Sequence, residues 1–140
     1  MSKSKMFNFC VEIYGARIHI FHCCEEEEVT LYLEKQFPGV TYERNNSMAA
    51  ITFVCEHKNF GNEYCVDFIT PLKTSSPGSH NTISHESLHI VCEISKDRGL
   101  KFDLDNLEPI NYLLGHIVQK INEEVFKKNK DSVMKTDGEK

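Results

Sequence analysis

Alternating apolar and polar positions near the start of the chain predict a β-hairpin. Residues 7–13 carry an apolar side chain at every second position, which is the spacing of a half-buried strand. Residues 14–17 include Gly15 and are typical of a turn, and residues 18–22 resume the alternation. Four successive glutamates at 25–28 then begin a segment that favours a helix, because acidic residues in a first turn suit the helix dipole.

A second hairpin is predicted in the middle of the chain. The strand-like segments 49–57 and 63–70 flank a turn with the sequence Asn-Phe-Gly-Asn. Residues 40–44 indicate a further short strand. The loop 71–81 is rich in Ser, Thr, Pro and Gly, and its last residue, Asn81, is a favourable helix N-cap.

Two helices are expected after this sheet. The first ends at Gly99, which suits a left-handed cap, and residues 100–105 form a short connection. The second has apolar residues at helical spacing, namely Ile110, Leu113, Leu114, Ile117, Ile121 and Val125. The predicted class is α+β, with a small, twisted, mostly antiparallel sheet packed on both helices. Residues 1–126 are expected to form a single domain, and the charged tail 127–140 is expected to be disordered.

The most specific motif lies in the first of these helices. Residues 85–89 read His-Glu-Ser-Leu-His, the HExxH pattern. Positions i and i+4 share one helical face, so His85 and His89 can direct both imidazoles at one metal ion. Glu86 is then placed to act as general base on a metal-bound water. Because Glu86 is the only charge between Thr82 and Cys92, we expect this helix to be buried on most sides.

A catalytic zinc ion usually has three protein ligands, so a further ligand is needed. Glu108, near the start of the second helix, is the preferred candidate, with His116, Asp103, Asp105 and His80 as competitors. Asp105-x-x-Glu108 also reads as a capping box, which would give Glu108 a local role.

The position of Glu108 on its helix presents a difficulty. A continuous helix would place Glu108 opposite the apolar stripe, beside Tyr112 and Gly115. Gly115 would then have to let the two helices approach closely on that side. Tyr112 and His116 follow Glu108 on the helix and are candidates for stabilising an oxyanion.

The motif and the residues around it resemble a known group of enzymes. A His-Glu-x-x-His helix followed by Asn106-Leu107-Glu108 is similar to the gluzincin branch of the zincin metallopeptidases. The hairpin at Tyr14-Gly15 adds a likeness to small HExxH proteins encoded by bacteriophages, and ImmA/IrrE-type peptidases are more distantly similar. The resemblance implies a zincin-like fold, a Zn²⁺ cofactor, a peptide or protein substrate and a location in a host cytoplasm. It also implies that an edge strand binds the substrate backbone, for which residues 49–57 are the candidate.

The composition of the chain argues against several other classes of protein. The formal net charge is −5 with no basic run in the body of the chain, which argues against nucleic-acid binding. No apolar stretch has the length of a membrane span, and the start of the chain does not resemble a signal peptide. A cytoplasmic protein with reduced thiols is therefore expected. The six cysteines include no C-x-x-C pair, so zinc-ribbon spacing is absent from the sequence.

The sequence thus predicts a zinc-dependent metallopeptidase in which His85, His89 and Glu108 hold the metal and Glu86 is the general base. The alternative is a non-catalytic, zincin-like binding module that has a structural or vestigial zinc site and interacts with a host or phage protein. A fourth protein ligand on the metal would favour that alternative, because it would fill the position that water needs.

Overall fold

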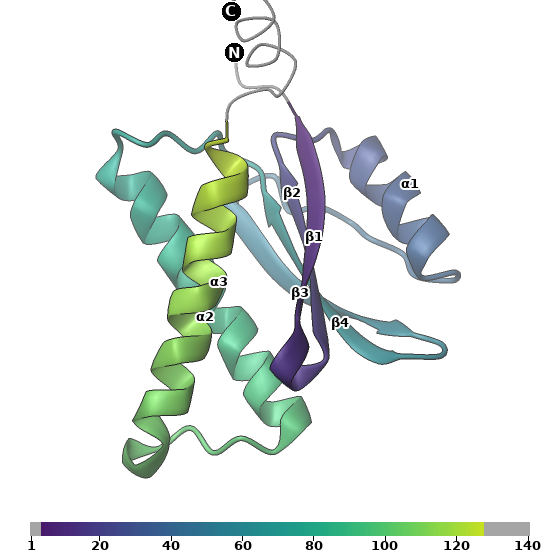
Figure 1. The fold of residues 1–140 in the computed structure, drawn as a ribbon. Helices are drawn as coiled ribbons and strands as arrows, with labels where there is room; N and C mark the ends of the chain where they lie inside the picture. Colours follow the sequence, from purple (N-terminus) through teal and green to yellow (C-terminus); the bar gives the residue numbers. More distant parts are fainter. Residues whose placement is uncertain (1–3, 128–140) are drawn as a thin grey trace, which may run out of the picture.

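A four-stranded mixed β-sheet with helices on both faces forms the fold (Figure 1). The structure, a computed structural model, describes residues 4–127 apart from the side chain of Asn106. Its elements are β1 (Lys5–Val11), β2 (Ala16–His22), α1 (Glu26–Gln36), β3 (Ala50–His57), β4 (Gly61–Phe68), α2 (Pro77–Arg98) and α3 (Leu107–Val125), with 3₁₀ turns at Glu12–Tyr14 and Leu104–Asn106. The α+β class is therefore confirmed. Apart from Lys127, the predicted disordered tail lies outside the described residues.

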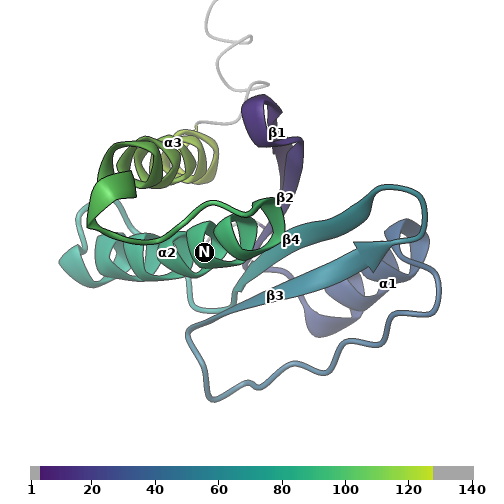
Figure 2. The same cartoon turned by 90° about the horizontal axis from the view of Figure 1, so that it is seen from below.

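The strand order is β1-β2-β4-β3. The two predicted hairpins, β1–β2 and β3–β4, are both present and antiparallel. They meet through the parallel pair β2–β4, which makes the sheet mixed. Figure 2 shows β3 at the outer edge of the sheet, with the chain reaching it from α1. The predicted candidate for a substrate-binding strand is thus an edge strand.

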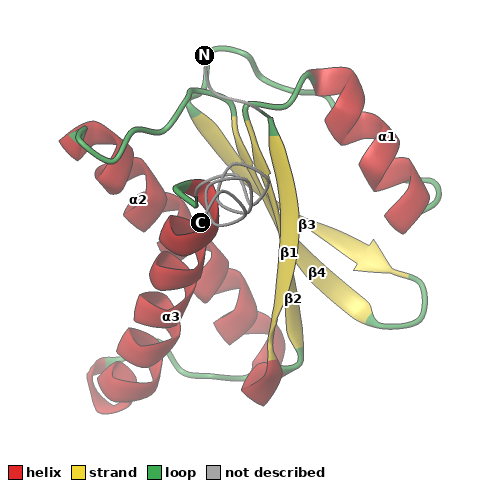
Figure 3. Cartoon of the chain, turned by 45° about the horizontal axis from the view of Figure 1, so that its top comes forward, coloured by secondary structure: helices red, strands yellow, loops and turns green. Residues whose placement is uncertain are grey.

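The helices form one layer on each face of the sheet (Figure 3). On one face, α2 and α3 pack their buried residues, including Ile90 and Ile117, against Ile18, Ile20 and Val66. The other face is covered by α1, whose contacts with the sheet form the second buried cluster: Val29 and Leu33 with Phe21, Cys55 and Cys65. Alternation of side chains along each strand supplies both clusters, because every second residue faces the same side.

One predicted boundary of the motif helix is wrong and the other is confirmed. Helix α2 begins at Pro77, because the Ser76 side chain accepts a hydrogen bond from the Ser79 amide and proline suits the first helical position. Asn81 is therefore inside the helix and is not its N-cap. At the other end, Gly99 takes the predicted left-handed cap with φ 69°.

The predicted strand at residues 40–44 is also absent. Tyr42 and Arg44 instead turn toward the sheet and bind Asp67, which is fully buried. The tyrosine hydroxyl donates at 2.6 Å, and the guanidinium donates at 2.9 and 3.0 Å. A buried carboxylate needs such partners, so side-chain pairing takes the place of strand pairing in this segment.

Candidate metal centre

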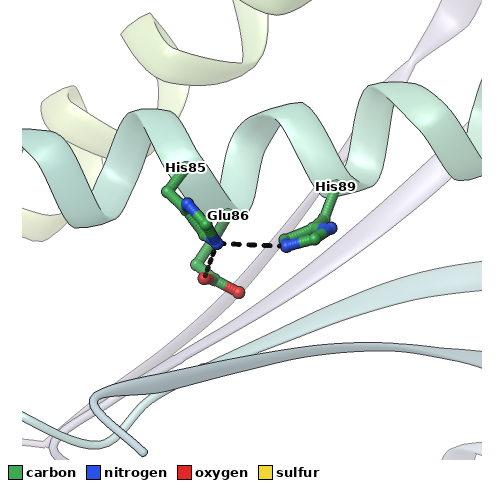
Figure 4. Close-up of side chains that lie close together, drawn as sticks. All are labelled: His85, Glu86 and His89. Carbon is green, nitrogen blue, oxygen red and sulfur yellow. Dashed lines mark hydrogen bonds and ion pairs between the residues drawn. The ribbon is translucent and has the colours of Figure 1, made fainter.

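His85, Glu86 and His89 form a cluster near the middle of α2 (Figure 4). One nitrogen or oxygen from each lies within 4.8 Å of the others, and the three side chains project from the same side of the helix. The HExxH spacing produces this directly, since residues four apart are stacked on one face. The structure therefore brings together the three most specific residues of the predicted site.

The spacing of the two imidazoles suits a tetrahedral metal. Their Nε2 atoms are 3.2 Å apart. Two nitrogens bound to one tetrahedral zinc at roughly 2.0–2.1 Å would be separated by about 3.3 Å. The same distance suits a hydrogen bond between two neutral rings, so a metal and a shared proton compete for the position. His85 is open to solvent, with its side chain 64% exposed, so the site is accessible from outside.

Glu86 is held differently from the histidines. Its side chain is only 9% exposed, and its Oε1 accepts a hydrogen bond of 2.8 Å from the Thr52 hydroxyl on β3. The other oxygen, Oε2, lies 3.8 Å from His85 Nε2. Thr52 therefore fixes one carboxylate oxygen and leaves the second directed toward the histidines. The prediction that the motif helix is buried on most sides is wrong, because an exposed face runs along it from Ser84 to Cys92 and includes both histidines. This face carries no carboxylate, lysine or arginine, so the scarcity of charge in the sequence did not indicate burial.

A groove runs between the cluster and β3. It has a volume of about 310 Å³ and is lined by Met48, residues 50–54 of β3, and His85, Glu86, His89 and Glu93 of α2. Glu93 lies one helical turn beyond His89 on the same face and is half-buried. The lining contains two carboxylates and no lysine or arginine.

The backbone of β3 offers hydrogen-bonding groups to this groove. The carbonyl of Ala49 accepts from the amide of Ile69, so these two residues form a hydrogen-bonded pair at the start of the β3–β4 hairpin. In an antiparallel ladder such pairs alternate, so Ala50, Thr52 and Val54 direct their amides and carbonyls toward the free edge. The edge next to Glu86 is therefore unpaired within the sheet.

A second link between α2 and the sheet lies beyond Glu93 on the helix. Asp97 accepts hydrogen bonds from Tyr64 at 2.7 Å and from Asn62 at 3.0 Å. Although burial opposes it, these hydrogen bonds lower the pKa of Asp97, so the carboxylate form is favoured. Because Tyr64 pairs with Val54, α2 and β3 run in the same general direction from Thr52 to Val54.

The structure does not bring Glu108 to the histidines, contrary to the prediction that it is the third ligand. Among the described residues, Glu86 is the only carboxylate in the cluster with His85 and His89. Glu108 is exposed in the first turn of α3, where the apolar stripe packs inward and the opposite face meets solvent. Gly115 makes no close approach on that face, since a Cβ there would meet nothing within 4 Å.

Tyr112 and His116, the predicted oxyanion stabilisers, also lie away from the cluster. They line a different cavity, of about 630 Å³, between α3 and the tip of the β1–β2 hairpin. The motif side chains face β3 instead. This correction has the same cause as that of Glu108: α3 packs on α2 on a side that is not the metal-binding side.

The competing ligands do not complete the cluster either. His80, Asp103, Asp105 and His116 are not part of it among the described residues. His80 lies within hydrogen-bond distance of the Thr74 carbonyl, and Asp103 accepts a hydrogen bond from the amide of Asp105. That hydrogen bond caps the 3₁₀ turn Leu104–Asn106.

Thr52 and Glu93 are site residues that the sequence analysis missed. Glu93 carried a usable signal, because it follows His89 by four positions on the same helix. Thr52 carried none, since its contact with Glu86 joins segments 34 residues apart and depends on how the sheet packs on α2.

Comparisons with known proteins do not assign the chain to a family. No family model matches the chain. No curated protein and no solved structure matches it either. No helix within residues 4–127 is long and apolar enough to cross a membrane.

Proposed function

We propose that this protein is a zincin-like, zinc-dependent hydrolase that cleaves a peptide bond in an extended chain bound along β3. The observation that carries the proposal is the pair of Nε2 atoms 3.2 Å apart, with Glu86 beside them and an unpaired strand edge opposite. Imidazole nitrogens are suitable ligands for zinc, and exposure of the site leaves room for water and substrate.

Each residue of the cluster has a distinct role in this proposal. His85 and His89 would hold the metal through Nε2. When bound, zinc would supply a Lewis acid and lower the pKa of a coordinated water. Glu86 Oε2 is the oxygen that is not engaged by Thr52, so it is the atom suited to accept a proton from water in the groove. The same oxygen can return that proton to the leaving amine.

The strand edge supports a peptide as the substrate. Backbone groups of Ala50, Thr52 and Val54 face the groove, and an extended peptide can pair with them as an added strand. The Thr52 side chain bonds to Glu86 at the same level of the sheet. A peptide on this edge would therefore pass directly beside the proposed base.

One observation favours a second candidate, a zincin-like binding module with a weak or vestigial zinc site. The described residues bring only two imidazoles and Glu86 together, whereas a catalytic zinc usually has three protein ligands plus water. If Glu86 itself served as the third ligand, it would no longer be available as a base. The free edge of β3 would then serve to bind a host or phage protein without cleaving it.

Replacement of Glu86 by Gln separates the two candidates. The hydrolase proposal expects zinc-loaded wild type to cleave an unfolded protein such as casein, and Glu86→Gln to retain zinc while losing roughly 10²-fold or more of the rate. Glu34→Gln is the matched control, because it removes one exposed carboxylate on the opposite side of the sheet. Equal cleavage by wild type and Glu86→Gln would refute the mechanism. Loss of zinc in Glu86→Gln would favour the ligand role and the binding module.

A further inference from the structure

The groove between α2 and β3 has two carboxylates in its lining. Its charged residues are Glu86 and Glu93, and neither lysine nor arginine contributes to the lining. Glu86 already has a donor in Thr52. No Lys, Arg or His side chain within residues 4–127 forms an ion pair with Glu93, so its carboxylate is available to a ligand.

Hydrogen bonds between α2 and the sheet define where Glu93 lies along the edge of β3. Along the groove, Thr52 is linked to Glu86, and Val54 pairs with Tyr64, which is linked to Asp97 further along α2. Glu93 therefore lies toward the Val54 end. It is one turn, about 6 Å, beyond His89, which corresponds to roughly two residues of an extended chain.

We propose that Glu93 is a specificity-determining residue that selects a lysine or arginine side chain in a peptide bound along β3. The inference rests on the proposed function in taking this groove as the peptide site. A peptide added antiparallel to β3 reaches Val54 before Thr52, so its basic residue would lie on the N-terminal side of the cleaved bond. The ion pair would be half-buried against α2, where the charge is screened less than on an open surface.

Binding of matched peptides tests the proposal independently of catalysis. The probes are short fluorescein-labelled peptides of alternating threonine and valine that carry either one lysine or one glutamate, with anisotropy as the readout. We expect the lysine peptide to bind wild type about three- to fivefold more tightly than the glutamate peptide, as for a partly exposed ion pair. Glu93→Gln should remove this difference, whereas the matched control Glu34→Gln should keep it.

The outcomes separate this inference from the proposed function. A lysine preference that depends on Glu93, without cleavage of either peptide, supports the inference and counts against the hydrolase. Cleavage with equal binding of the two peptides supports the hydrolase and overturns the inference. The inference is also overturned if neither peptide binds, or if Glu93→Gln keeps the full preference.

Discussion

The hydrogen bond from Thr52 to Glu86 joins the sheet to the motif helix, and its removal gives a sharp test of the site. Thr52→Val preserves the branched shape of the side chain and deletes only the hydroxyl. Among the described residues, Thr52 is the one side-chain hydrogen-bond donor to Glu86, at 2.8 Å. The carboxylate would remain almost buried, with its side chain 9% exposed, and would lose that donor.

The expected cost follows from the surroundings of Glu86. Hydrogen bonds to charged groups contribute roughly 1.5–3 kcal/mol to stability. Water in the groove can replace part of the lost bond, and the new methyl group gains some apolar contact. We therefore expect the free energy of unfolding to fall by about 1.5–2 kcal/mol, the lower part of that range. Thr52→Ser keeps the hydroxyl and should lose less.

Urea unfolding of the metal-free protein measures this directly. The midpoint should shift at constant m-value, since the surface exposed on unfolding is unchanged. A double-mutant cycle with Glu86→Ala should give a coupling energy of about 1 kcal/mol between Thr52 and Glu86. Equal stability of Thr52→Val and wild type, or a coupling energy of zero, would refute the argument that Thr52 positions Glu86.

Two further predictions concern the residues that support the sheet. Arg44→Met should lower the free energy of unfolding by about 3–5 kcal/mol, because it leaves the fully buried Asp67 without its cation. The double variant Arg44→Met/Asp67→Leu should be less destabilised, since it removes the buried charge as well. Urea unfolding that ranks the two variants in the opposite order would contradict this. Burial lowers the pKa of His22 in the folded protein, and the positive charge of nearby Lys5 lowers it further. As the pH falls below 6.5, the unfolded chain therefore binds a proton at His22 before the folded protein does. Stability is lost from that pH down to the lower pKa of the folded state. His22→Gln should reduce the slope of unfolding free energy against pH between 7 and 5.5 by up to about 1.4 kcal/mol per unit, and identical slopes would exclude this role for His22.

Local sequence signals predicted most of the secondary structure. Alternation fixed both hairpins, and the run of glutamates marked the start of α1, where Glu25 and Glu28 form a capping box. The HExxH spacing alone was enough to bring His85 and His89 together, because both residues belong to one helix. These features depend on neighbours within a few positions of one another.

The wrong N-cap at Asn81 was a local error, but the other failures involve relations between elements. Glu108 was assigned to the site because two helices in a hairpin are neighbours, but neighbouring helices can meet on any pair of faces. The apolar stripe of α3 packs against α2 and the sheet, while His85 and His89 face β3. The missing strand at residues 40–44 has a similar origin. The buried carboxylate of Asp67 needs hydrogen-bond donors, and Arg44 and Tyr42 supply them from a segment far away in the sequence. Helical periodicity did place Glu108 opposite the apolar stripe, but it does not encode which faces of two helices meet or where a buried carboxylate finds its partners.

Metal binding by the histidine pair is the central claim, and zinc content tests it most directly. Purified wild type, His85→Ala and His89→Ala would be exposed to zinc, dialysed and measured by mass spectrometry of the metal. His116→Ala is the matched control, because it removes an exposed histidine from α3. The account predicts about one zinc per chain in wild type and in His116→Ala, and little in the other two variants. Absence of zinc from wild type, or its full retention in His85→Ala, would contradict the account.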